Sequence, residues 1–241
     1  MYNLFATPGW FNGLDLAFEV VSFVIAMLIA AYSFRAYQLS KENRYGYFAL
    51  AFAAIALSLL LKIFTSSILY YEPVRDVTAE ALLPVMGGTL DFSDLLYRGA
   101  FFIQMVAMLG GWLLVFFISQ KSRARLSKYY EVSQIALFIY LILLISVIAN
   151  FKFFVFYLTG AVILSLTVLN YYKNYLNTDQ NENAFLVMIA FLFILLANMC
   201  YALIFLEGIF YVLAEVLQLV GFLMLLYTYR KVAECGRKMK E

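Results

Sequence analysis

Long apolar segments dominate this chain and restrict what it can fold into. A helix needs about 20 consecutive, mostly apolar residues to cross the hydrocarbon layer of a bilayer. Composition agrees, because 65% of the residues are hydrophobic and 13% are charged, whereas a soluble domain is roughly one quarter charged. The sequence therefore predicts an all-α membrane protein, a single seven-transmembrane helix bundle over residues 1–241. The expected spans are 14–38, 46–70, 98–119, 132–149, 151–170, 185–206 and 209–230.

The basic residues predict how this bundle is oriented. Cytoplasmic loops of membrane proteins are enriched in Lys and Arg. Here the basic residues gather in the first, third and fifth connections and after the last span, whereas the longest connection, 71–97, is rich in Asp and Glu. We therefore expect a multi-pass protein of the cell membrane. Its N-terminus and the loop 71–97 are expected outside, and the basic tail 231–241 is expected in the cytoplasm.

Three charged residues fall inside the predicted spans. Glu19, Lys62 and Glu215 lie about 8, 12 and 9 Å below the outer ends of their helices, at 1.5 Å per residue. Charges at such depth are costly, so they usually face the interior of the bundle and mark a functional site. Together with uncharged polar residues at similar depth, they predict a polar layer that lines a cavity open to the outside. The uncharged members of this layer are Gln104, Asn198, Tyr201 and Gln218.

The charges of this layer do not balance, because it holds two carboxylates and one ammonium group. In one alternative, Lys62 is neutralised by Glu19 or Glu215 and the amide side chains only hold helices together. The remaining carboxylate must then be protonated or bind a cation. In the other alternative, the cavity binds a cation, an amine or a small zwitterion.

Several function classes are disfavoured by what the sequence lacks. There is no His, no glycine-rich phosphate loop, no nucleophile elbow and no intramembrane Asp pair, so we expect no enzyme, no metal site and no cofactor. The span 209–230 has no Lys for a retinal Schiff base, as rhodopsins require. The net charge of +2 is too small to indicate a nucleic-acid partner. Uncharged stretches at 48–57 and 185–196 argue against a pump or an aqueous channel.

Two segments near the start of the chain resemble a known class of sensor. Residues 18–22 (FEVVS), Arg35 and residues 47–52 (YFALAF) look like parts of the multi-helix membrane sensor domains that precede histidine kinases and diguanylate cyclases in prokaryotes. The resemblance covers roughly the first 70 residues. It implies a bundle that senses a membrane or extracellular cue, with the Glu19 face in the sensing cavity. Because only the segment 231–241 follows the last span, we expect the signal to pass to a partner.

Three functions remain open at this point. The first is a receptor-like or sensor-like bundle with an outward-facing polar cavity, acting through another membrane or cytoplasmic protein. The second is a small-solute or ion transporter, in which the apolar half is the inner gate and whole helices rock. The third is an accessory or structural subunit of a membrane complex. In each case the lipid bilayer is an expected partner.

Overall fold

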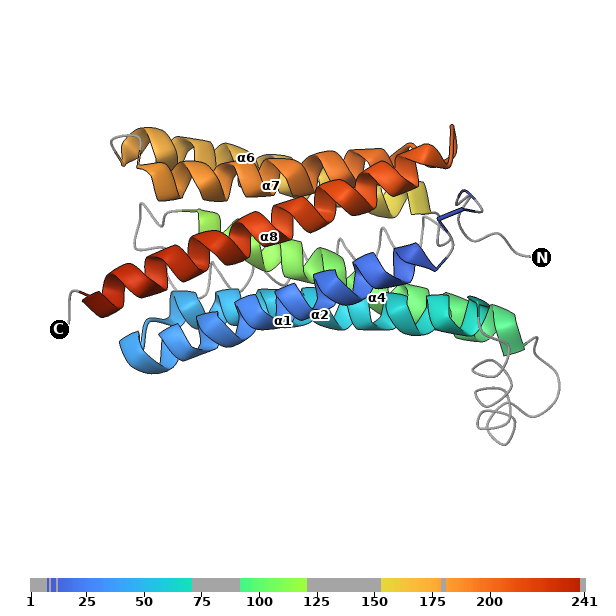
Figure 1. Cartoon of the computed structure of the whole chain (residues 1–241), viewed down its shortest axis with the longest axis horizontal. Coiled ribbons are helices and arrows are strands. Elements are labelled where there is room, and N and C mark those ends of the chain that lie inside the picture. The colour runs from blue at the N-terminus through green and yellow to red at the C-terminus, as the bar shows by residue number, and fades with distance from the viewer. Residues whose placement is uncertain are drawn as a thin grey trace, which may run out of the picture.

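The computed structural model describes residues 8, 10, 11, 13–70, 92–120, 153–178 and 181–238. In this part of the chain all regular secondary structure is α-helical, and six helices are long and apolar enough to cross a membrane (Figure 1). The described part of the chain therefore has the helices of a multi-pass membrane protein. The helices are α1 (Leu14–Ser40), α2 (Asn43–Tyr70), α4 (Phe92–Ser119), α6 (Phe153–Asn177), α7 (Glu182–Ala202) and α8 (Ile209–Lys238).

Six of the seven predicted spans correspond to these helices, and the span 132–149 lies outside the described residues. The helix ends differ from the prediction. The helix α4 begins at Phe92, inside the predicted loop 71–97, and α8 continues to Lys238, so that much of the basic tail is helical. By contrast, α7 ends at Ala202, before the predicted 206. Hydropathy locates the apolar middle of a span, whereas a helix continues beyond it for as long as its backbone hydrogen bonds are satisfied.

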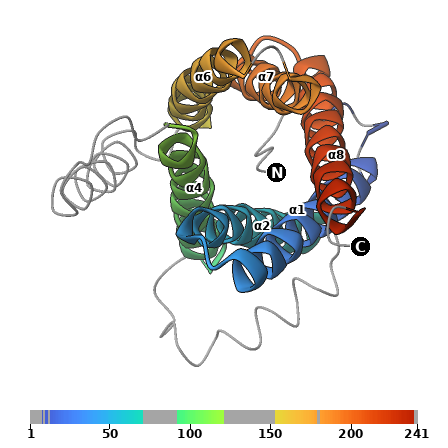
Figure 2. The same cartoon turned by 90° about the vertical axis from the view of Figure 1, so that its left-hand side faces the viewer.

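Seen end-on, the described helices form a closed ring in the order α1, α2, α4, α6, α7 and α8 (Figure 2). Within this ring, α1, α2 and α4 pack extensively on one another, and so do α6, α7 and α8. Contacts between these two sets, α1 with α8 and α4 with α6, are less extensive. The bundle thus consists of two three-helix units, which we call the first unit (α1, α2, α4) and the second unit (α6, α7, α8).

Equivalent contacts in the two units indicate an approximate two-fold relation between them. In both units the second helix carries the pattern Ala-Phe-x-x-Ile, and one glycine of the third helix packs against it. A Cβ atom added to Gly111 of α4 would lie 2.6 Å from Ile55 Cγ1 and 2.9 Å from the Ala51 carbonyl oxygen. The same addition to Gly221 of α8 would place the Cβ atom 2.6 Å from Ile194 Cγ1 and 3.0 Å from the Ala190 carbonyl oxygen. The absence of a side chain lets the helices approach equally closely in both units.

Aromatic side chains fill the ring between the two units, and their contacts follow the same symmetry. The rings of Trp112 and Phe222, which occupy equivalent positions next to the two glycines, stack with centroids 6.3 Å apart. The cross-unit pairs Phe52 with Phe222 and Phe191 with Trp112 are both edge-to-face, each with centroids 6.5 Å apart. All four side chains are fully buried. We call them the aromatic plug, because at this level the interior of the ring is closed and apolar.

Candidate functional site

A cluster of three charged side chains joins the two units near the end of the bundle where α1 begins. The Lys62 Nζ of α2 lies 3.0 Å from Glu19 Oε1 of α1 and 2.6 Å from Glu215 Oε1 of α8. The three side chains are only 7%, 0% and 1% exposed, respectively. Lys62 therefore forms ion pairs with Glu19 of its own unit and with Glu215 of the second unit. The alternative in which Lys62 pairs with one glutamate and leaves the other free does not describe this arrangement.

Tyrosine rings surround the ammonium group. The Lys62 Nζ lies 5.2 Å from the ring centroids of both Tyr201 of α7 and Tyr211 of α8, within the range of a cation–π contact. The Tyr211 hydroxyl donates a hydrogen bond of 3.3 Å to Glu19 Oε1. Tyr157 of α6 stacks on Tyr201 with centroids 4.6 Å apart. We call these six residues, Glu19, Lys62, Tyr157, Tyr201, Tyr211 and Glu215, the charge cluster.

The local sequence explains why Glu19 points inward. Gly13, with φ 91°, ends the preceding turn, and the Asp15 carboxylate accepts hydrogen bonds from the backbone N–H groups of Gly13 (2.8 Å) and Leu16 (2.9 Å). This fixes the first turn of α1 with Asp15 buried. Glu19 follows one turn later on the same face, as i, i+4 spacing requires. The start of α1 thus sets the depth at which Glu19 meets Lys62.

The cluster carries more negative than positive charge when its groups are ionised, and part of it lacks hydrogen-bond partners. Among the described residues, no donor reaches Glu19 Oε2 and no partner reaches the hydroxyls of Ser22 or Tyr201, although these atoms are buried. Ser22 lies one helical turn from Glu19 on α1. A buried carboxylate oxygen without a donor costs free energy that an added donor would recover. The cluster therefore favours a cationic group or a proton.

The structure separates the seven predicted site residues into two sets. Glu19, Lys62, Tyr201 and Glu215 contact one another in the charge cluster, as predicted from their depth. The other three are buried about one turn closer to the aromatic plug. There, Asn198 Nδ2 donates to the Ile194 backbone carbonyl of its own helix, the Gln104 backbone carbonyl accepts from the Ser58 hydroxyl, and Gln218 lies one turn after Glu215. Of these hydrogen bonds, the one between Ser58 of α2 and Gln104 of α4 joins two helices.

The predicted cavity was open to the outside, whereas the structure has the charge cluster covered. Phe11, which precedes α1, is 2% exposed and packs edge-to-face on Tyr211 with centroids 6.2 Å apart. It also contacts Phe18 on the first turns of α1. The sequence predicted only that the N-terminus lies outside, and a buried aromatic residue before α1 was not predicted. A ligand that enters from this end must therefore displace Phe11.

Two members of the charge cluster were not predicted as site residues. Tyr211 precedes Glu215 by four residues, so its place on the same helix face was a usable signal. Tyr157 offers no such signal, because no charged residue of α6 lies near it in the sequence. Its place beside Tyr201 depends on how α6 packs against α7.

No family model, curated protein or solved structure matches this chain. Its function must be inferred from the charge cluster and from the arrangement of the two units.

Proposed function

We propose that this chain is a non-enzymatic protein of the cell membrane that binds a small cationic or zwitterionic ligand at the charge cluster and acts through a partner protein, as a receptor or sensor does. In this proposal the start of α1 faces the outside, and the opposite end, which carries Lys41, Lys173 and Lys231, faces the cytoplasm. The resemblance of roughly the first 70 residues to prokaryotic membrane sensor domains supports the same direction of signalling.

The observation that carries the proposal is the unpartnered Oε2 atom of Glu19 in a cluster that is net negative when both glutamates are ionised. An ammonium group is the simplest chemical match, since it supplies both a positive charge and hydrogen-bond donors. The carboxylate of a zwitterion would at the same time find a counter-charge in Lys62. The surrounding tyrosine rings also favour a cationic group over a neutral one.

The position of the cluster explains how binding would be passed on. Lys62 connects the first unit to Glu215 of the second, where the helix contacts between units are less extensive. A ligand that competes for Glu19 or Glu215 changes this connection and hence the relative position of the units. Because α8 carries Glu215 and continues to Lys238 at the opposite end, it provides a continuous path to a partner.

A thermal-shift screen of the purified full chain tests this proposal. The probes are Na⁺, Ca²⁺, putrescine, glycine and arginine, measured on wild type, Glu19→Gln and Glu215→Gln. A matched control is Glu182→Gln, which removes an exposed carboxylate that pairs with Lys231 at 3.0 Å at the other end of the bundle. A ligand at 100 times its Kd stabilises a protein by about 2.7 kcal/mol, which raises Tm by about 5 to 10 °C at this chain length.

We expect at least one probe to raise the Tm of wild type and of the control but of neither cluster variant. If no probe does so, the charge cluster is packing, and the chain is better regarded as a structural or accessory subunit.

A transporter is the second candidate, and the two-fold relation between the units favours it. Many transporters consist of two repeats related by an axis along the membrane normal, with the substrate at the interface between them. The aromatic plug would then be the inner gate and Phe11 part of the outer one. Counterflow uptake into proteoliposomes separates the candidates: binding with uptake by wild type but not by Glu19→Gln indicates a transporter, whereas binding without uptake indicates a receptor.

A further inference from the structure

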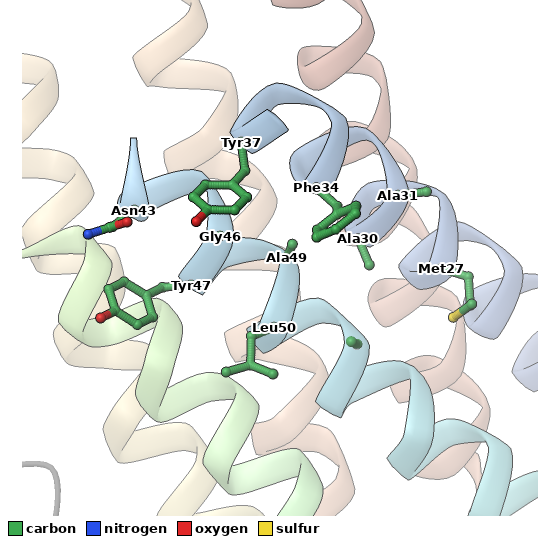
Figure 3. A pocket seen from close by; sticks show the side chains of 11 residues that line it. Met27, Ala30, Ala31, Phe34, Tyr37, Asn43, Gly46, Tyr47, Ala49 and Leu50 are labelled. Carbon is green, nitrogen blue, oxygen red and sulfur yellow. The ribbon is translucent and has the colours of Figure 1, made fainter. Parts of the chain in front are cut away.

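An apolar groove lies between α1 and α2 on the outer surface of the first unit, toward the end where the two helices are joined (Figure 3). Its volume is about 700 Å³, which lies within the range of roughly 300 to 1,000 Å³ typical of small-molecule sites. Its lining begins at Met27 on α1 and reaches Tyr37 near the joining turn. Asn43 and Tyr47 of α2 add polar groups at that same end, and the rest of the lining is apolar.

This groove belongs to one unit and is not a general consequence of the fold. Three small side chains of α2 form its floor, and α7, the equivalent helix of the second unit, carries three large ones in their place. The floor residues are Gly46, Ala49 and Ala53, and their equivalents, counted from the shared Ala-Phe-x-x-Ile pattern, are Phe185, Met188 and Leu192. The sequence of α7 therefore does not repeat the three small residues that line the groove in the first unit.

The charges near the groove also distinguish the two units. Lys41 is exposed and lies in the joining turn, between the lining residues Tyr37 and Asn43, and its backbone N–H donates a hydrogen bond of 2.8 Å to the Tyr37 carbonyl. Arg35 and Arg44 are exposed in the same region, where Glu42 is the acidic residue of the joining turn. The segment 35–44 is therefore net positive. In the second unit, the described part of the α6–α7 turn carries no basic side chain, and Lys173 is the basic residue in the last turns of α6.

We propose that this groove binds one acyl chain of an anionic phospholipid, with the phosphate near Lys41 and Arg35. From Met27 to Tyr37 the lining covers about 15 Å of helix, about half of the 30 Å hydrocarbon layer, so its length matches one leaflet. The Tyr37 and Tyr47 hydroxyls and the Asn43 amide then lie at headgroup depth, where they donate to phosphate or ester oxygens. Basic side chains at this depth select anionic lipids. The proposal does not depend on a ligand at the charge cluster.

Native mass spectrometry of the detergent-purified full chain tests this site. Phosphatidylglycerol, phosphatidylcholine and inorganic phosphate are titrated separately, and the Kd of each is measured. Wild type should bind phosphatidylglycerol about tenfold more tightly than phosphatidylcholine, a difference that one or two surface basic residues account for. Inorganic phosphate at the same concentration should neither bind nor displace the lipid.

Four variants assign the effect to the groove. Ala53→Leu fills the groove from α2 and Ala31→Leu from α1, both at exposed positions, and each should weaken the binding of both lipids about tenfold. Lys41→Asn, which suits the left-handed φ of 58° at this residue, should lower the preference for phosphatidylglycerol from about tenfold to about twofold, because Arg35 remains. Lys173→Gln removes an exposed charge from α6 at the same end and should leave both Kd values unchanged.

The proposal is overturned if wild type does not prefer phosphatidylglycerol, or if neither filling variant weakens binding. It is also overturned if Lys173→Gln lowers the preference as much as Lys41→Asn does, because the effect would then come from the net charge of this end. Copurification of a second protein chain that both filling variants release would show that the groove holds a protein helix in place of lipid.

Discussion

Replacing Lys62 by Met tests whether the charge cluster holds the two units together. Met has nearly the length of Lys, so it keeps the contact with the rings of Tyr201 and Tyr211 while removing the ammonium group. Glu19 and Glu215 then face each other across the site that Nζ occupied, 3.0 and 2.6 Å from their Oε1 atoms. Removal of one partner from a buried ion pair costs about 3 to 5 kcal/mol, because the remaining charge is left buried. We expect a drop in Tm of about 6 to 20 °C at this chain length.

The assay is thermal unfolding in detergent between pH 5 and pH 9. The loss should be largest at pH 9 and smaller at pH 5, because protonation of either carboxylate relieves the repulsion between them. The triple variant Glu19→Gln, Lys62→Met, Glu215→Gln should recover most of the lost stability, since a neutral buried set is often as stable as an ionic one. Lys173→Met, which removes an exposed charge of α6, should change the free energy of unfolding by at most about 0.5 kcal/mol.

The reasoning is refuted if Lys62→Met matches wild type at every pH, or if the triple variant is no more stable than the single one. In the first case the three charges do not share one site. In the second case Lys62 contributes through packing, and its charge is incidental.

Two further predictions concern the fold and its orientation. Gly221→Ala and Gly111→Ala should each destabilise the bundle by about 1 to 3 kcal/mol, because the new methyl group meets a backbone carbonyl and an isoleucine side chain in both units. Gly110→Ala has no atom within 4 Å of the added Cβ and should be neutral or slightly stabilising; equal thermal unfolding of all three variants would argue against the close approach of these helices. For orientation, Trp10→Cys, at a 64% exposed position, should react with an impermeant maleimide on intact cells, and Asn177→Cys only after permeabilisation. The reverse pattern would invert the proposed topology.

The sequence predicts the parts of this fold that depend on hydropathy and helical spacing. The depth of Glu19, Lys62 and Glu215 within apolar segments was enough to predict that they contact one another, because each charge must avoid lipid and the bundle has a single interior. The uncharged polar residues were less predictable. A side-chain amide such as that of Asn198 finds a hydrogen-bond acceptor on its own helix, so a similar depth does not imply a contact with the other polar residues.

The two-fold relation between the units could not be predicted by hydropathy. It rests on Gly111, Gly221 and two Ala-Phe-x-x-Ile patterns among residues that are apolar for other reasons. In a membrane helix, lipid-facing and core-facing positions are both apolar, so periodicity barely distinguishes them. The covering of the cluster by Phe11 was also hidden, because a single aromatic residue before a helix carries no signal of burial.

The central claim is that the charge cluster binds a cationic group, and isothermal titration measures this directly. The titrant is whichever of putrescine, arginine, glycine, Na⁺ or Ca²⁺ raises the Tm of wild type most. We predict one site per chain, with an affinity reduced by about 30-fold or more in Glu19→Gln, because loss of a buried charged contact costs about 2 to 5 kcal/mol. Glu182→Gln, which lacks an exposed carboxylate at the opposite end, should bind as wild type does. Equal affinities of wild type and Glu19→Gln, or no saturable binding by wild type, would contradict the claim.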